Sequence, residues 1–159
     1  MHDLNLISFS AEDTTGIGKG IGKAAESGDI ILLSGELGTG KTCLTQGIAK
    51  GLEIRERVHS PTFVLVSEYA GRLNLFHMDL YRLDTLNDVL DLGLEEYFFG
   101  EGVSVVEWAD KAPEAFPGSH LFVSIIHNEF DSRRLHLRGY GQRYETLIDN
   151  LKQSLRKFQ

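Results

Sequence analysis

The stretch from Ser34 to Thr42, SGELGTGKT, has the spacing Gly35-x-x-x-x-Gly40-Lys41-Thr42. This is the pattern of a P-loop, in which backbone N–H groups of a glycine-rich turn surround a phosphate. Residues 30–33, just before it, form a short apolar run typical of a strand buried on both faces. Residues 41–52, just after it, have the apolar period of a helix. The motif therefore has the strand–loop–helix context that phosphate binding requires.

We expect the loop and the first turn of this helix to bind a nucleotide. Lys41 is predicted to bridge the β- and γ-phosphates, and the hydroxyl of Thr42 to ligate Mg²⁺. Cys43, the only cysteine, is predicted to be a small buried side chain rather than a nucleophile. The predicted nucleotide-binding residues of this segment are Gly35, Glu36, Leu37, Gly38, Thr39, Gly40, Lys41, Thr42 and Cys43.

Two carboxylates follow predicted strands: Asp79 ends the run LFHMD, and Glu107 ends the run VSVVE. The carboxyl ends of strands form the edge at which α/β sheets bind ligands. A P-loop protein needs an acid there to organise Mg²⁺ and its waters. The spacing leaves open which acid binds the metal and which aligns the attacking water. Lys41, Asp79 and Glu107 are thus the candidate catalytic residues, and Thr42, Asp79 and Glu107 the candidate metal ligands.

The segment HSPTF, residues 59–63, lies between the P-loop helix and the next predicted strand. Thr62 is placed like the loop threonine that senses a γ-phosphate through Mg²⁺ in switch-type NTPases, and a turn that starts a strand is the equal alternative. His59 and His77 are expected to be structural, because neither has a second histidine at metal-ligand spacing. Trp108, the only tryptophan, is either a core residue or a partner contact at the rim of the sheet.

The remaining pattern predicts a mixed sheet. Ser10 begins a helix that reaches about Glu26. Residues 63–69 and 72–78 are joined by too short a connection for a parallel crossover, so we expect an antiparallel hairpin. Residues 121–126 and 134–137 are predicted to form a second hairpin.

A further buried strand is predicted over residues 103–106, with short helices over 84–90 and 94–99. Residues 142–158 have the period of an amphipathic helix with five residues inward: Tyr144, Leu147, Ile148, Leu151 and Leu155. The sum is an α/β fold of the P-loop NTPase type, with a small parallel sheet flanked by antiparallel strands and helices on both faces. At 159 residues the chain is expected to be one domain, residues 1–159.

The net charge of −7 argues against direct, tight binding of DNA or RNA, which needs a basic face. The basic residues are scattered except for a group that we expect to face solvent: Arg133, Arg134, Arg138 and Arg143. No apolar run approaches the roughly 20 residues of a membrane span, and the first residues lack the features of a secretory signal. A single cysteine excludes an internal disulfide. We therefore expect a cytoplasmic protein without a membrane partner.

Several P-loop classes are disfavoured by missing motifs. The Asn-Lys-x-Asp element that GTPases use for guanine does not occur, and the one Asp-x-x-Gly, residues 13–16, precedes the P-loop. A small-molecule kinase usually has an arginine-bearing lid, and no segment has the pattern of a long lid. ATP is favoured over GTP, and hydrolysis over phosphotransfer. A kinase, and a nucleotide-gated binding module with little hydrolysis, stay open as alternatives.

Five segments in this order resemble the bacterial tRNA threonylcarbamoyladenosine biosynthesis ATPase family, TsaE (formerly YjeE): LSGELGTGKT, VHSPTFVLVSEY, HMDLYRL, LGLEEYF and VVEWAD. The resemblance implies a cytoplasmic ATPase that acts with TsaB and TsaD when a threonylcarbamoyl group is placed on adenosine 37 of tRNA. It implies that TsaD carries out the transfer. The ATPase would hydrolyse ATP to reset the complex, and would meet the tRNA only indirectly.

The resemblance also implies roles for single residues. Ser60 and Thr62 match the Ser-Pro-Thr switch of the family, and Asp79 matches its Asp-Leu-Tyr-Arg acid. Glu107 and Trp108 match the Glu-Trp pair that is implicated in hydrolysis and partner contact. Thr15 aligns with a threonine near the adenine. Cys43 stands where the family more usually has a second threonine.

Overall fold

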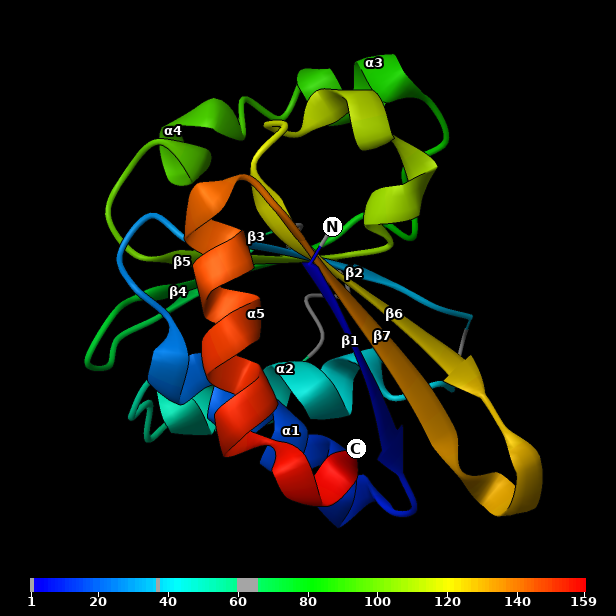
Figure 1. Cartoon of the computed structure of the whole chain (residues 1–159). Coiled ribbons are helices and arrows are strands. Elements are labelled where there is room, and N and C mark those ends of the chain that lie inside the picture. The colour runs from blue at the N-terminus through cyan, green and yellow to red at the C-terminus, as the bar shows by residue number, and fades with distance from the viewer. Residues whose placement is uncertain (1, 37, 60–65) are drawn as a thin grey trace.

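A seven-stranded mixed sheet organises the computed structural model (Figure 1), which describes residues 2–36, 38–59 and 66–159. Its spatial order is β1-β7-β6-β2-β5-β4-β3. The four strands β6, β2, β5 and β4 are parallel, whereas β7, β1 and β3 pair antiparallel at the two sides. The predicted parallel core with antiparallel additions is therefore confirmed. The strands are β1 His2–Ser8, β2 Ile30–Ser34, β3 Val66–Tyr69, β4 Leu75–Asp79, β5 Val103–Glu107, β6 His120–His127 and β7 Arg133–Tyr140.

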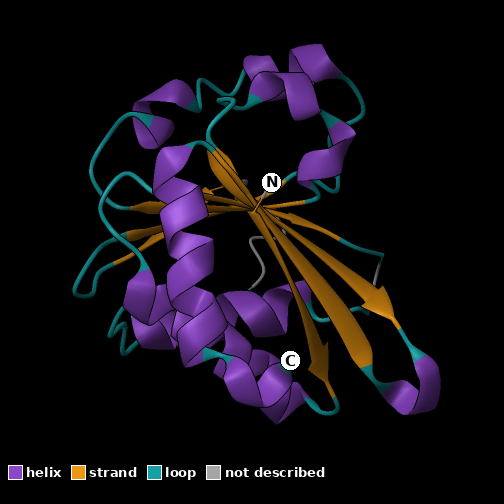
Figure 2. Ribbon diagram, in the orientation of Figure 1, coloured by secondary structure: helices purple, strands orange, loops and turns teal. Residues whose placement is uncertain are grey.

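Helices cover both faces of the sheet, as predicted (Figure 2). The three long helices share one face: α1 Ala11–Ala24, α2 Lys41–Gly51 and α5 Gln142–Ser154. The other face is covered by α3 Leu86–Leu90, α4 Glu95–Phe98 and two 3₁₀ turns, Ala109–Lys111 and Pro113–Ala115. Further 3₁₀ turns are Glu129–Asp131 and Arg156–Phe158. Within the described residues, no helix has the length and apolar character needed to cross a bilayer.

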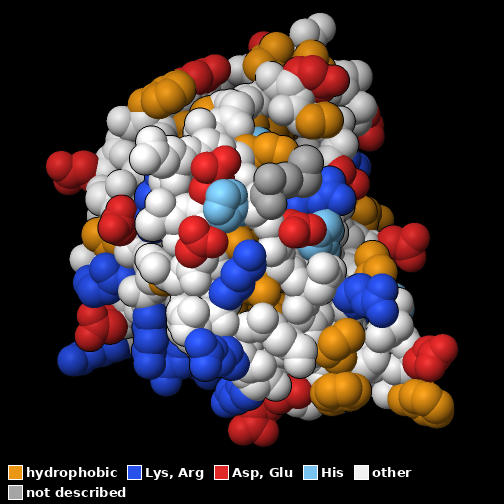
Figure 3. All heavy atoms as spheres, viewed as in Figure 1, with side chains coloured by type: hydrophobic (Ala, Val, Ile, Leu, Met, Phe, Trp, Pro, Cys, Tyr) orange, Lys and Arg blue, Asp and Glu red, His pale blue; other side chains and the backbone are white. Residues whose placement is uncertain are grey.

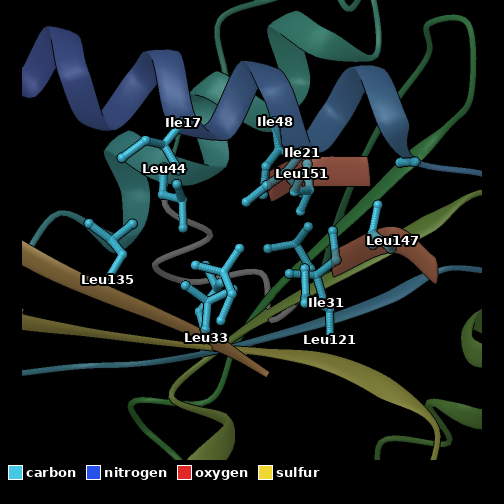
Figure 4. Close-up of a cluster of buried hydrophobic side chains, with 14 of the residues drawn as sticks. Ile17, Ile21, Ile31, Leu33, Leu44, Ile48, Leu121, Leu135, Leu147 and Leu151 are labelled. Carbon is cyan, nitrogen blue, oxygen red and sulfur yellow. The ribbon is translucent and has the colours of Figure 1, made fainter. Parts of the chain in front are cut away.

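The larger core lies between the sheet and the three long helices (Figure 4). Strand β2 contributes Ile31 and Leu33, both fully buried, which explains its uninterrupted apolar sequence: each face of this central strand is covered. The helical side chains pack toward the strands at a spacing of three or four residues, as Ile17 and Ile21 do on α1. This packing fixes β2 and α2, the two elements that bracket the P-loop.

Helices α1 and α2 pack at unusually short range through glycines. A Cβ atom on Gly18 would lie 2.3 Å from the carbonyl oxygen of Leu44, and one on Gly47 would lie 2.2 Å from that of Thr15. Real Cβ atoms do not approach backbone oxygen so closely, so only glycine permits this contact. The glycine-rich sequence of α1 is therefore a packing surface for the P-loop helix.

Apart from small shifts at the ends of elements, the structure differs from the prediction in three places. Strand β1 was not predicted, although Leu4 and Leu6 alternate with exposed residues and are buried against β7. The first hairpin has a longer connection than a tight turn, because Gly71 and Arg72 pack against the end of α2, with the N–H of Arg72 donating to the carbonyl of Leu52 at 2.7 Å. Its predicted residues 63–65 lie outside the described residues. The last predicted helix ends at Ser154 and continues as a 3₁₀ turn.

Candidate nucleotide site

The carboxyl edge of the parallel strands brings the predicted site residues together. The P-loop follows β2, Asp79 ends β4 and Glu107 ends β5. The sheet register places Glu107 beside Leu33 on one side and beside Asp79 on the other. Two acids that are far apart in the sequence therefore stand next to the loop, as parallel pairing requires.

The loop has the backbone geometry that its glycines permit. Gly38 and Gly40 have φ angles of 79° and 108°, in the left-handed region that favours glycine. Gly40 is the N-cap of α2 and provides no side-chain cap, so backbone N–H groups at this helix start are left for a ligand. The arrangement is that of an anion-binding turn at a helix N-terminus.

Lys41 lies folded along the loop and is almost fully buried. Its Nζ donates to the carbonyl oxygens of Gly35 and, at 3.0 Å, of Glu36. The same ammonium lies 3.9 Å from the centre of the Trp108 ring, a cation–π contact. Burial lowers the pKa of Lys41 below its ordinary value, and the nearby carboxylates, Glu107 first, partly oppose that shift.

Glu107 is buried and makes two side-chain contacts. Its Oε1 accepts from the hydroxyl of Thr42 at a long 3.5 Å, and its Oε2 is hydrogen-bonded to Nε2 of His77 on β4. Its main-chain oxygen accepts from the N–H of Leu80 at 3.1 Å. The Glu107 carboxylate is thus held between the P-loop threonine and a buried histidine, which the sequence did not associate with the site.

Asp79 is half-buried, and its Oδ1 accepts from the N–H of Tyr81 at 2.9 Å. Asp79 and Glu107 both line a cavity of about 280 Å³. Its other lining residues are Gly38, Gly40, Lys41, Thr42 and Trp108. We call it the P-loop cavity.

The oxygen donors of the P-loop cavity are the kind that Mg²⁺ prefers. Mg²⁺ is usually bound by one or two protein oxygens, with phosphate and water oxygens completing its shell. The Thr42 hydroxyl and the two carboxylates can supply the protein oxygens. Over the described residues, no three or more His, Cys, Asp and Glu side chains are grouped so as to hold a metal by themselves. The donor set therefore fits a Mg²⁺ that arrives with a nucleotide.

Trp108 is half-buried beside the P-loop, so it is neither a full core residue nor a freely exposed one. Its backbone is in the left-handed region, with φ at 61°, which is uncommon for a bulky residue. Its ring lies over Lys41 and packs against the ring of Tyr81 with 5.0 Å between centroids. This turn directs the ring over the site instead of away from the sheet.

A second cavity, of about 230 Å³, adjoins the loop on the side of α1. We call it the α1 cavity, and it is lined by Ser10, Ala11, Thr14, Gly38, Thr39, Gly40, Cys43, Asp131 and Arg133. Cys43 is half-buried there, which corrects the prediction of a buried residue: its position on α2 turns toward α1 and not toward the sheet. Thr15 is held next to it, with 3.2 Å between its hydroxyl oxygen and Sγ of Cys43.

The predicted arginine group separates into different roles. Arg133 was expected to face solvent, but its Nε donates to the carbonyl oxygen of Thr39 at 3.2 Å, which ties the β6–β7 hairpin to the P-loop. Arg143 binds the buried carboxylate of Asp29, with Nη2 and Oδ2 2.7 Å apart, and was also missed. Arg134 and Arg138 are exposed, as predicted. No local sequence signal distinguishes these arginines, because the contacts come from distant elements.

Three predicted site residues, Leu37, Ser60 and Thr62, lie outside the described residues, so their roles stay predictions. His59 is exposed, and its N–H donates to the hydroxyl of Tyr69 at 3.3 Å. Figure 3 shows hydrophobic side chains at the free end of the β6–β7 hairpin, where Phe130 is 95% exposed.

Comparison with known proteins gives one consistent family. The family model for "Threonylcarbamoyl adenosine biosynthesis protein TsaE" matches residues 8–135. A tRNA threonylcarbamoyladenosine biosynthesis protein TsaE from Bacillus subtilis is 41% identical over 152 residues, covering 95% of each chain. The protein of that name from Treponema pallidum is 42% identical over 122 residues, covering 77% of this chain and 90% of the relative.

A solved structure agrees with the sequence matches. The crystal structure of Bacillus subtilis YdiB is similar with a TM-score of 0.85 and 38% sequence identity, and the similarity covers 96% of this chain and 95% of YdiB. The family model spans most of the chain and includes the P-loop, Asp79 and Glu107. The chain therefore belongs to the TsaE family of P-loop proteins.

Proposed function

We propose that this chain binds ATP with Mg²⁺ at its P-loop and hydrolyses it as a component of tRNA threonylcarbamoyladenosine biosynthesis. The observation that carries the proposal is the P-loop cavity, in which Lys41 and Thr42 meet Asp79 and Glu107 around one space. The relatives are named as tRNA threonylcarbamoyladenosine biosynthesis proteins, and this is why we propose that pathway. From the family resemblance we further infer that TsaB and TsaD are its partners, and that its turnover resets their complex.

The residues divide the chemistry as follows. When ATP binds, the Lys41 ammonium gives up its hydrogen bonds to the loop carbonyl oxygens and donates to phosphate oxygens instead. Backbone N–H groups of the loop bind the β-phosphate. Mg²⁺, when bound, neutralises charge that develops on the phosphates. Asp79 and the Thr42 hydroxyl hold the metal and its waters. Glu107, with one oxygen at the cavity, aligns the attacking water and accepts its proton.

The nucleoside is assigned to the α1 cavity, which shares Gly38 and Gly40 with the P-loop cavity. Cys43 and the neighbouring Thr15 lie on this side of the loop. We also propose that Ser60 and Thr62 belong to the segment that senses the γ-phosphate. Trp108 is proposed as the residue that a partner protein contacts at the site.

The test is phosphate release from ATP by the chain alone and with a TsaB–TsaD complex and tRNA. Lys41→Ala should weaken ATP affinity by about tenfold or more, because a charged hydrogen bond to phosphate is lost. Glu107→Gln should keep ATP affinity and lower kcat by about 10²- to 10⁴-fold, the usual contribution of a general base. Lys50→Ala, an exposed lysine on the same helix, and Glu101→Gln, an exposed acid, are the matched controls.

Three results would contradict the proposal. Phosphate recovered on a small-molecule acceptor would indicate a kinase. Stable retention of ATP without phosphate release in the full assembly would indicate a binding module. Repeated tRNA modification cycles that proceed equally well without this chain would remove it from the pathway.

A further inference from the structure

His77 is the buried polar group that the proposed mechanism leaves unused. It lies on β4 two residues before Asp79, and its side chain is completely buried. Its Nε2 is hydrogen-bonded to Oε2 of Glu107 across the β4–β5 pair. Because this buried imidazole is hydrogen-bonded to a candidate catalytic carboxylate, its role goes beyond filling space in the core.

The contacts of His77 determine which nitrogen carries the proton. A carboxylate only accepts hydrogen bonds, so Nε2 of His77 must donate to Glu107. Among the described residues, the buried Nδ1 atom of His77 has no hydrogen-bond partner. A lone pair there is tolerated more easily than a buried N–H without an acceptor. The arrangement therefore places a proton on Nε2, between His77 and Glu107.

This bond divides the two oxygens of Glu107. Oε2 is hydrogen-bonded to His77, which does not line the P-loop cavity. Oε1 is on the side of Thr42, which does line it. A glutamate side chain has several rotatable bonds, so a second anchor is needed to keep its carboxylate in one orientation. His77 does not line the cavity and touches no position assigned to ATP, so it acts only through Glu107.

We propose that His77 is a positioning residue for ATP hydrolysis, which fixes Glu107 so that one oxygen faces the attacking water. The inference rests on the proposed function. It predicts a defect in kcat with little change in KM or in ATP affinity, because a water displaced by about 1 Å can cost about a hundredfold in rate while the phosphate contacts stay in place.

Two amide substitutions separate this role from simple packing. In His77→Gln the amide nitrogen is as many bonds from Cα as Nε2 of histidine, so it can still donate to Glu107. In His77→Asn the nitrogen corresponds to Nδ1 and stops one bond short. We expect His77→Gln to retain kcat within about fivefold and His77→Asn to lose about a hundredfold. ATP affinity, followed by Trp108 fluorescence or calorimetry, should change by less than about threefold in both.

A double variant of His77 and Glu107 and an NMR spectrum of His77 test the role further. With Glu107→Gln present, His77→Asn should lower kcat no further, because both changes remove the same effect. In nitrogen-15 NMR spectra of the free chain, His77 should show the tautomer with its proton on Nε2, and Glu107→Ala should remove the hydrogen-bond shift of that proton.

The inference is overturned if His77→Asn keeps the wild-type kcat, if the Gln and Asn variants are equally impaired, or if the losses add in the double variant. A different NMR tautomer also overturns it. A wild-type chain that hydrolyses no ATP in the full assembly overturns the proposed function, and this inference with it. A wild-type chain that does hydrolyse ATP, beside an equally active His77→Asn chain, overturns the inference alone.

Discussion

Lys41 has an environment in which its positive charge is costly. Its ammonium is removed from water and is compensated by carbonyl oxygens, a tryptophan ring and more distant carboxylates. Burial opposes the charged form, and the carboxylates only partly restore it. A phosphate is a stronger partner for an ammonium than a carbonyl is, so the proposed binding of ATP would relieve this unfavourable charge.

We predict that Lys41 loses its proton below the ordinary lysine value of about 10.4, because burial lowers its pKa. Since the unfolded chain then binds more protons, the stability contribution of Lys41 rises with pH between the folded and unfolded pKa values. ATP affinity should fall over the same range, because the ammonium is the binding form. A carbon-13 NMR titration of the Lys41 side chain measures this pKa. A midpoint at or above about 10.4 would contradict the prediction.

For single residues, the sequence predicted which side chains lie together at the P-loop cavity where their placement follows from local spacing. Lys41 and Thr42 are fixed by the P-loop motif, and the two acids by their position at strand ends. His77 and Arg133 were assigned to other roles, because their partners are set by sheet register and by a hairpin that returns to the loop. A strand's neighbour in the sheet is not encoded by the strand's own sequence.

Among the elements, the contact between α1 and α2 is the one that positions the P-loop lysine. Glycines on both helices permit it, and each would bring a Cβ within 2.4 Å of a carbonyl oxygen. They are Gly18 and Gly22 on α1, and Gly47 and Gly51 on α2. Because Lys41 is the first residue of α2, any separation of the two helices moves the lysine relative to the sheet.

Gly47→Ala should therefore lower both stability and ATP affinity. The added methyl group meets the Thr15 carbonyl, and such overpacking costs about 1–3 kcal/mol. Urea unfolding and an ATP titration measure the two effects. Gly16→Ala is the control: it is on α1, and its Cβ would meet only the Phe158 ring at 3.2 Å. It should change stability less than Gly47→Ala does, because the better helix propensity of alanine, up to about 1 kcal/mol, offsets the small shift that the Phe158 ring has to make. Equal stability of the two variants would refute the argument.

Most helices and strands were predicted from the sequence, but strand β1 was missed although its apolar residues alternate as in a strand. Residues 142–158 were predicted as a helix because of their regular apolar spacing, and α5 occupies most of this range. In β1 the alternation of Leu4 and Leu6 with exposed residues is also regular. A strand of this kind gives no sign of its partner, and β7 lies almost a full chain length away. The short connection after β3 indicated a hairpin, but packing against α2 set its length.

In the whole molecule, Arg143 joins three parts of the fold. From α5 it donates to the carboxylate of Asp29 before β2, and its Nη2 also donates to the carbonyl oxygen of Ala24 at the end of α1 at 3.0 Å. The Asp29 side chain is only 3% exposed, and Arg143 is its cationic partner. The hydrogen bond to Asp29 raises the pKa of Arg143, and partial burial of the guanidinium opposes that rise.

We predict that Arg143→Ala lowers the free energy of unfolding by about 3 kcal/mol, because a buried carboxylate loses its cationic partner and keeps the N–H of Glu26. Urea denaturation measures the change. Arg134→Ala, an exposed arginine on β7, should stay within about 0.5 kcal/mol of the wild type. A loss no larger for Arg143→Ala than for Arg134→Ala would show that Asp29 finds another partner or is solvated.

The pairing of β1 with β7 has a consequence for synthesis. His2 pairs with Gly139 and Ser8 with Arg133, so β1, which precedes the other described strands along the chain, has to wait until β7, the last of them, has been made. Until then Leu4 and Leu6 stay without their burial site, while the P-loop and the parallel strands have already emerged. Contacts so distant along the chain form slowly. During translation, the sheet is therefore expected to close at this side last, after the nucleotide-binding half has taken shape.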